Sequence, residues 1–331
     1  MNPARDSLLI LYTGGTIGMQ MSAAGLAPAS GFEERLRVEQ AVHSECRLPD
    51  WRFQELSPPI DSANITQAHW LAMRDAIVSA VERDGCTGVL VLHGTDTLAY
   101  TAAALSFLLL GLPVPVLLTG SMLPAGVEGS DAWGNLFGAL TLLEQGMTPG
   151  VQVFFHGRVL HGARVNKRNS EAFDAFAEAL RGVPAAPCIS VPAALDYRVV
   201  RHNVNLAVLP LFPGLRAEHL HALLGSGVQG LLLECFGSGT GPSDNQPLLD
   251  ALRDAHQRGV VLAAISQCTE GRVTFDTYAA GSQLAACGVI SGGAMTREAA
   301  LGKLFALLGA GLEQAEAERW FTRDLCGERA G

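Results

Sequence analysis

Residues 7–18 read SLLILYTGGTIG, an apolar run that meets two glycines, a threonine and a third glycine. The leucine-rich run predicts a strand buried on both faces, as in a parallel sheet. The turn lacks the lysine of a phosphate-binding loop and the glycine spacing of a dinucleotide fingerprint. Apart from a plain tight turn, what remains is a threonine, Thr16, at the carboxyl end of the first strand, where open α/β sheets place their ligands.

Further apolar runs alternate with helical patterns along the chain. We expect strands over 87–94, 114–120 and 150–157 and helices over 66–84, 97–111 and 135–146. This alternation predicts an α/β fold with a larger, mostly parallel N-terminal sheet domain over residues 1–184. A linker rich in proline and alanine is expected over 185–206, before a smaller C-terminal α/β domain over 207–331 that ends in a helical stretch at 296–321.

The composition excludes several classes of protein. The 331 residues are 48% hydrophobic and 17% charged, which allows a large buried core. A net charge of -9 argues against nucleic acid and anionic membranes as partners. The longest apolar stretch, residues 105–120, is interrupted by Gly111, Pro113 and Pro115, so we expect no membrane span. The N-terminus has no signal-peptide pattern, and the seven scattered cysteines include no C-x-x-C pair. We therefore expect a cytoplasmic protein with reduced thiols and no zinc site.

Polar clusters follow other strands or precede helices. HGTDT, at residues 93–97, precedes an expected helix, whose N-terminus favours an anion or a developing oxyanion near Thr95 and Asp96; ordinary N-capping is the alternative. PPIDSANIT, at residues 58–66, is a similar cluster that contains Ser62. Lys167 lies in GARVNKRNS, and a lysine held in a dry cleft can act as a base, although most lysines face solvent.

Six motifs occur in one order over most of the chain: TGGTIGMQ, DSANIT, HGTDTLAYTAAALSF, LLTGSMLP, NKRNSEAFDAF and ISQCTEGRV. Together they closely resemble the bacterial-type asparaginase/glutaminase family, in particular its cytoplasmic type I branch. The resemblance implies hydrolysis of L-asparagine to L-aspartate and ammonia through a threonine acyl-enzyme. It also implies that no metal or organic cofactor takes part, and that the protein is a homodimer or homotetramer.

The resemblance also implies roles for particular residues. Thr16 is expected to be the nucleophile, while Thr95, Asp96 and Lys167 form a second triad that assists proton transfer and activates water. This is chemically sensible, because a threonine hydroxyl is a weak nucleophile until a base takes its proton.

Substrate binding is implied for a second group of residues. Asp96 would pair with the α-ammonium group of the substrate and Ser62 with its α-carboxylate, with Asp61 beside them. Backbone N–H groups near Thr95 and Ser121 would form the oxyanion hole.

The sequence departs from the family pattern at several positions. Leu26 stands where many relatives carry a tyrosine that touches the nucleophile, and we expect Tyr278 to replace it, from a neighbouring subunit; a buried structural tyrosine is the alternative. Glu234 and Asn166 occupy positions that hold an arginine and a threonine in the allosteric site of some type I enzymes. Because an acid does not hold a carboxylate as an arginine does, we expect no homotropic activation there.

Other functions remain open at this point. Within the family these are a glutaminase/asparaginase of broader specificity and the amidohydrolase subunit of a tRNA-dependent amidotransferase. Outside it, a nucleotide-binding oxidoreductase is disfavoured by the missing G-x-G-x-x-G motif, and a non-catalytic amino-acid-binding module by the presence of all four expected catalytic residues.

Overall fold

The computed structural model describes residues 7–22, 25–42, 49–179, 190–276 and 278–329. The chain forms two compact units, Met1–Glu178 and Ala179–Gly331. Part of the expected linker, residues 185–189, lies outside the described residues. Each unit contains its own parallel sheet, so the predicted α/β class with two sheets is confirmed.

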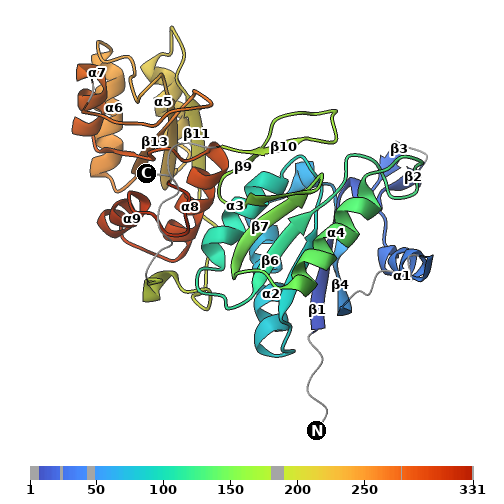
Figure 1. The fold of residues 1–331 in the computed structure, drawn as a ribbon. Coiled ribbons are helices and arrows are strands. Elements are labelled where there is room, and N and C mark those ends of the chain that lie inside the picture. Colours follow the sequence, from blue (N-terminus) through green and yellow to red (C-terminus); the bar gives the residue numbers. More distant parts are fainter. Residues whose placement is uncertain (1–6, 23–24, 43–48, 180–189, 277, 330–331) are drawn as a thin grey trace. The chain divides into compact units, whose positions relative to one another are not determined.

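The N-terminal unit contains a six-stranded sheet in the order β4-β1-β5-β6-β7-β8 (Figure 1). The strands are β1 (Ser7–Gly14), β4 (Asp50–Ile60), β5 (Gly88–Leu92), β6 (Pro115–Thr119), β7 (Gly150–Phe155) and β8 (Arg158–His161). Adjacent strands run parallel except for the last pair, where β8 returns antiparallel to β7. The carboxyl ends of β1, β5 and β6 therefore meet at one edge of the sheet.

Both faces of this sheet are covered by helices, which explains its uninterrupted apolar strands. Leu8, Ile10 and Tyr12 of β1 belong to a buried cluster with residues of α1 (Phe32–Val42) and α4 (Ala132–Gln145). The helices α2 (Gln67–Glu82) and α3 (Leu98–Leu108) also pack on the sheet, α2 on β1 and α3 on β7. Since Leu9 and Leu11 alternate with the clustered positions and are also buried, strand β1 has two buried faces.

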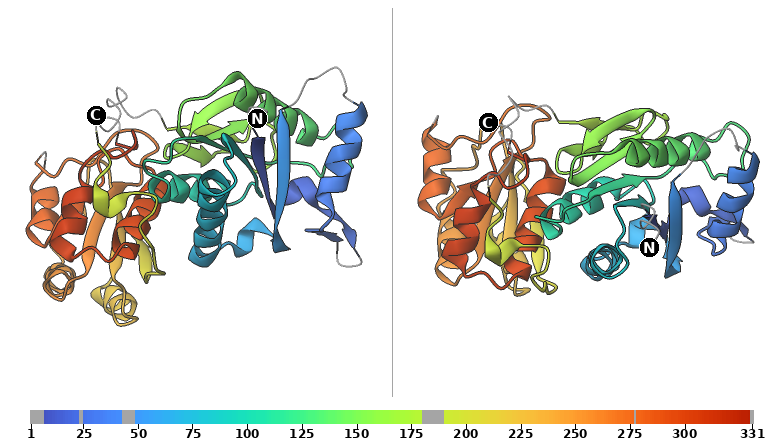
Figure 2. Two further views of the ribbon diagram at one scale, coloured as in Figure 1. Left: turned by 90° about the horizontal axis from the view of Figure 1, so that it is seen from below. Right: turned by 60° about the horizontal axis from the view of Figure 1, so that its bottom comes forward.

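The structure adds elements that the sequence analysis does not predict. Strand β4 carries polar residues and two prolines, a composition that is more typical of a loop. The sheet tolerates these residues because β4 lies at its edge. In both views of Figure 2 the long blue β4 lies beside the dark-blue β1, its partner. Two short hairpins join the unit: β2 (Gln20–Ser22) with β3 (Gly25–Ala27), and β9 (Val165–Lys167) with β10 (Phe176–Glu178).

The C-terminal unit has a four-stranded parallel sheet in the order β11-β12-β13-β14. Its strands are β11 (Leu206–Pro210), β12 (Gly230–Cys235), β13 (Val261–Ser266) and β14 (Val289–Ser291), and its first helices are α5 (Ala217–Leu224), α6 (Gln246–Gln257) and α7 (Ala279–Ala286). The helical stretch expected at 296–321 consists of two helices, α8 (Arg297–Gly309) and α9 (Gln314–Phe321). Gly311, at φ +76°, lies in the left-handed region between them and ends the first helix.

None of the helices in the described parts of the chain combines the length and the apolar character that crossing a membrane requires.

Candidate active site

Two glycine turns meet at the carboxyl edge of the N-terminal sheet. Strands β1 and β5 are parallel neighbours, and each runs into a glycine, Gly15 after β1 and Gly94 after β5. A Cβ atom on Gly15 would overlap the backbone of Gly94, so the two main chains are in direct contact. Gly15 also has φ +79°, which side chains of L-residues rarely allow. The contact therefore requires glycine at position 15 and brings the following residues, Thr16 and Thr95, to the same edge.

Thr16 begins a short 3-10 turn, Thr16–Gly18, directly after β1. The turn is closed by backbone hydrogen bonds from Gly18 N to Gly15 O (3.1 Å) and from Met19 N to Thr16 O (3.1 Å). The threonine is half-buried, and its hydroxyl makes no hydrogen bond to any residue within the described ranges. The hydroxyl is therefore available to a bound substrate, and no base among the described residues is hydrogen-bonded to it.

Lys167 joins the two polar residues of the HGTDT motif. It reaches them from strand β9, which packs against α3. Its Nζ donates hydrogen bonds to Thr95 Oγ1 (2.9 Å) and to Asp96 Oδ1 (2.7 Å). Thr95 is buried and the Lys167 side chain nearly so, whereas the Asp96 side chain is 64% exposed. An ammonium group in this place lowers the cost of negative charge on the Thr95 hydroxyl and leaves one Asp96 oxygen available to a cationic ligand.

Ser62 lies against the same turn. A Cβ atom on Gly94 would overlap the Ser62 side chain, and Thr97 Oγ1 donates to Ser62 O (2.8 Å). Ser62 is buried beside the Thr95 turn. Asp61 is exposed, and its carboxylate accepts a hydrogen bond from Ala63 N (3.2 Å), which caps a short turn at Ser62–Asn64.

Ser121 follows the next strand, β6, at the same edge. A Cβ atom on Gly120 would overlap the carbonyl oxygen of His93, so this turn also lies against the HGTDT segment. The buried Ser121 hydroxyl donates to Leu123 O (2.5 Å), which fixes its own loop. Asn135 Nδ2 donates to Gly120 O (3.0 Å) from helix α4 and holds the turn in place.

Two further sequence-based expectations concern the activator of Thr16. Leu26 lies on β3 opposite Met21 and is 48% exposed, so no hydroxyl comes from this position. Tyr278 lies in the C-terminal unit, immediately before α7, and is 59% exposed. The alternative interpretation of Tyr278 as a buried structural residue is therefore wrong, and its action on Thr16 stays a prediction.

One buried titratable residue at this edge is not singled out by the sequence analysis. His93 is fully buried between β5 and Gly94 and is hydrogen-bonded on both ring nitrogens. Its only sequence signal is a histidine at the end of a wholly apolar strand, directly before a polar turn.

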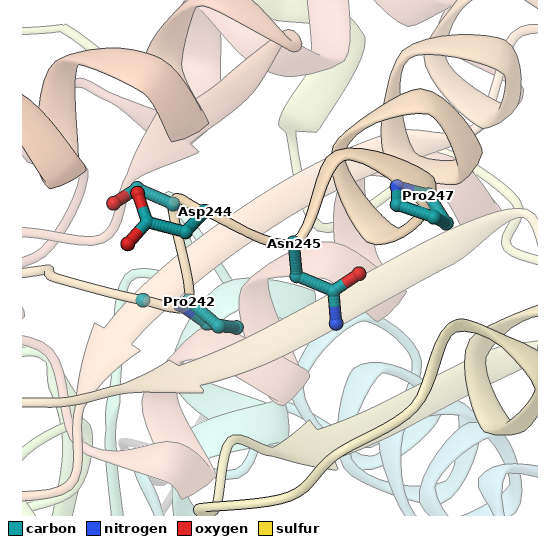
Figure 3. A pocket seen from close by; sticks show the side chains of 6 residues that line it. Pro242, Asp244, Asn245 and Pro247 are labelled. Atoms are coloured by element: carbon teal, nitrogen blue, oxygen red, sulfur yellow. The ribbon is translucent and has the colours of Figure 1, made fainter.

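A surface pocket on the C-terminal unit has fewer reactive side chains than the edge of the N-terminal sheet. It is lined by Gly241, Pro242, Ser243, Asp244, Asn245 and Pro247, between β12 and α6 (Figure 3). Asn245 Oδ1 accepts from Leu248 N (3.2 Å) and so caps α6. None of the expected site residues lines this pocket. Among the described residues, no group of three or more His, Cys, Asp or Glu side chains is arranged to hold a metal ion.

Comparison with known proteins shows the family of the chain. Residues 7–188 match the family model "Asparaginase, N-terminal" and residues 205–321 match "Glutaminase/Asparaginase C-terminal domain". The chain is 34% identical to L-asparaginase 1 of Escherichia coli K12 over 98% of both chains. Among solved structures, it is similar to L-asparaginase I from Vibrio cholerae (TM-score 0.86, 34% identity, 99% of this chain and 100% of that chain). The thermostable L-asparaginase from Thermococcus kodakarensis is also similar (TM-score 0.83, 31% identity, 98% and 99%).

Both halves of the chain are thus matched by family models, and the relatives are matched over nearly their full lengths. The threonine-bearing strand ends at the edge of the N-terminal sheet fall within the first of the two matched regions. The chain belongs to the asparaginase family.

Proposed function

We propose that this protein hydrolyses L-asparagine to L-aspartate and ammonia through an acyl-enzyme on Thr16. The observation that carries the proposal is the double contact of Lys167 Nζ with Thr95 Oγ1 and Asp96 Oδ1 (2.9 and 2.7 Å), beside the contact of Gly15 with Gly94. It joins a candidate nucleophile, a proton-transfer group and a carboxylate at one sheet edge.

The reaction proceeds in two half-reactions. Thr16 Oγ1 attacks the side-chain carboxamide carbon, and the proton that it loses is transferred to the amide nitrogen, so that the C–N bond breaks and ammonia leaves. The resulting ester is then attacked by water, one of whose protons passes through the Thr95 hydroxyl, beside Lys167, to Thr16 Oγ1, which leaves as a hydroxyl as L-aspartate is released. The Thr95 and Ser121 N–H groups stabilise the oxyanion in both steps.

Substrate selection in this proposal depends on charge. The free Asp96 oxygen pairs with the α-ammonium group, while Ser62 donates to the α-carboxylate, with Asp61 near it. One methylene separates asparagine from glutamine, and such a difference is worth about 1–3 kcal/mol in discrimination. A glutaminase of broader specificity is therefore the second candidate.

The proposed setting is a cytoplasmic homodimer or homotetramer without a metal or organic cofactor. The described cysteines Cys86, Cys235, Cys268, Cys287 and Cys326 are all free thiols, which suits a reducing compartment. Tyr278, exposed and carrying a hydroxyl, is proposed to approach Thr16 of a neighbouring copy.

The test is ammonia release from L-asparagine and L-glutamine by the purified protein. Thr16→Ala should abolish turnover, and Lys167→Met should lower kcat by about 100-fold or more, since positioned acid–base groups contribute about that much. Thr322→Ala, an exposed threonine in the other unit, is the matched control and should turn over as the wild type does. A wild-type protein that hydrolyses neither amide overturns the proposal.

The role of Tyr278 has a separate test. Tyr278→Phe should lower kcat, and mixing it with Thr16→Ala should restore activity, because a shared site then has one intact Thr16 and one intact Tyr278. Unchanged kcat in Tyr278→Phe refutes the role, and no restoration on mixing refutes its origin in a neighbouring copy.

A further inference from the structure

His93 connects the interior of the N-terminal unit with the HGTDT turn. The residue is fully buried at the end of strand β5, one position before Gly94 and two before Thr95. Its Nδ1 lies 2.7 Å from Gly94 O, and its Nε2 lies 2.9 Å from Thr101 Oγ1 on helix α3. Thr101 Oγ1 in turn accepts a hydrogen bond from Trp70 Nε1 of helix α2 (2.9 Å).

The chemistry of the partners fixes the direction of every bond in this chain. A carbonyl oxygen only accepts, so His93 Nδ1 carries the proton that is donated to Gly94 O. Burial lowers the pKa of His93 to about 4, against the smaller, opposite effect of the Gly94 hydrogen bond, so the ring is neutral at neutral pH. Nε2 is then an acceptor, and the Thr101 hydroxyl donates to it. An indole N–H can only donate, so Trp70 directs the Thr101 proton toward His93.

This series of hydrogen bonds ends at Gly94 O. That oxygen belongs to the peptide bond between Gly94 and Thr95, which also contains the Thr95 N–H. In a planar trans peptide the C=O of Gly94 and the N–H of Thr95 point in opposite directions. Holding Gly94 O therefore sets the direction of the Thr95 N–H. Within the described residues this N–H has no hydrogen-bond acceptor, so it is available to a ligand. Gly94 is also packed closely against Gly15 and the Ser62 side chain, which restricts movement of this peptide on that side.

We infer that Trp70, Thr101 and His93 are positioning residues, a directional hydrogen-bond chain that aims the Thr95 N–H at the developing oxyanion. The inference rests on the proposed amide hydrolysis. It assigns function to three residues that touch no reacting atom, and it explains why a polar chain is buried between two helices and a strand end. Buried polar groups otherwise cost stability unless every one is hydrogen-bonded.

Thr101→Val tests the chain at its middle. Valine keeps the branched shape of threonine but removes the hydroxyl that donates to His93 Nε2. The His93 ring then has either an unpaired buried acceptor at Nε2 or the opposite tautomer, in which the Nδ1 lone pair faces Gly94 O. We expect kcat for asparagine to fall about 10- to 100-fold, as expected for a displaced oxyanion donor, with KM within about threefold. Thr101→Ser restores the donor and should recover most of the loss. Ser106→Ala is the matched control: it removes a buried hydroxyl from the same helix that donates only to Ala102 O.

The tautomer itself is read by nitrogen NMR of protein labelled with ¹⁵N-histidine, with the His93 signal assigned by its loss in His93→Leu. At neutral pH the wild type should show a protonated Nδ1 and a bare Nε2, and Thr101→Val should change that pattern. Equal kcat in Thr101→Val and Ser106→Ala, or a wild-type ring protonated at Nε2, overturns the inference. A wild type with the expected tautomer but no amidase activity overturns the proposed function instead.

Discussion

Replacing His93 by asparagine should remove a pH-dependent loss of stability from the N-terminal unit. The amide nitrogen of asparagine can still donate to Gly94 O, but the side chain does not titrate. In the wild type, burial lowers the pKa of His93 from 6.5 to about 4. Between about pH 6.5 and pH 4, His93 is therefore protonated in the unfolded chain but not in the folded protein. Wild-type stability is consequently lost as the pH falls from 6.5 toward 4.

The size of the effect follows from the two pKa values. Each tenfold difference in proton affinity corresponds to about 1.4 kcal/mol, so the full cost is about 3 kcal/mol when the pH falls below both pKa values. Between pH 7 and pH 5 the wild type should lose about 2 kcal/mol through this residue alone. Other groups titrate in the same range, among them Asp324, whose pKa is raised to about 6, chiefly by burial. Comparing the variant with the wild type removes their contribution.

The assay is urea unfolding at pH 7 and pH 5, followed by tryptophan fluorescence. The chain has four tryptophans, and only Trp320 lies in the C-terminal unit. In a Trp320→Phe background the signal therefore reports the N-terminal unit. When the pH is lowered from 7 to 5, the free energy of unfolding should fall by about 2 kcal/mol more in the wild type than in His93→Asn. An equal fall in both proteins would show that His93 is not buried in its neutral form and would refute the reasoning.

Two further predictions concern other parts of the chain. Gly15→Ala should destabilise the N-terminal unit by about 3 kcal/mol or more, because it adds a collision with the backbone of Gly94 to an unfavourable φ of +79°. Gly85→Ala, at φ +69° with open space around it, should cost only about 1 kcal/mol, and equal losses in urea titrations of the two variants would contradict the contact. The rate of asparagine turnover should depend hyperbolically on substrate concentration, because buried Glu234 is an acid and offers no cation to a carboxylate. Its carboxylate accepts hydrogen bonds from Nε and from Nη2 (2.8 Å) of Arg297. A sigmoidal rate curve that Glu234→Ala makes hyperbolic would refute this prediction.

The sequence by itself determined that the chain has two α/β domains, and it placed Thr16 at the end of the first strand. Strands buried on both faces read as uninterrupted apolar runs, so β1, β5, β6 and β7 were predictable from residues such as Leu9 and Val91. Thr16 and the HGTDT motif were each placed near a strand end from the sequence, whereas the parallel pairing of β1 with β5, which brings the two ends to one edge, comes from the structure. Strand β4 was not predicted, because an edge strand with polar residues and prolines has no apolar pattern of its own.

Only the tertiary structure decided which polar groups actually meet. Lys167 is 71 residues from Asp96 in sequence, and no local pattern could show that its Nζ lies 2.7 Å from that carboxylate. The series of hydrogen bonds that joins Trp70, Thr101 and His93 could not be predicted from the sequence either, since these residues come from two helices and a strand end. Whether a hydrogen bond forms depends on the donor–acceptor distance to within a few tenths of an ångström, and the packing of the helices on the sheet sets that distance. The apolar pattern fixes which elements form, whereas the contacts between their ends fix the chemistry.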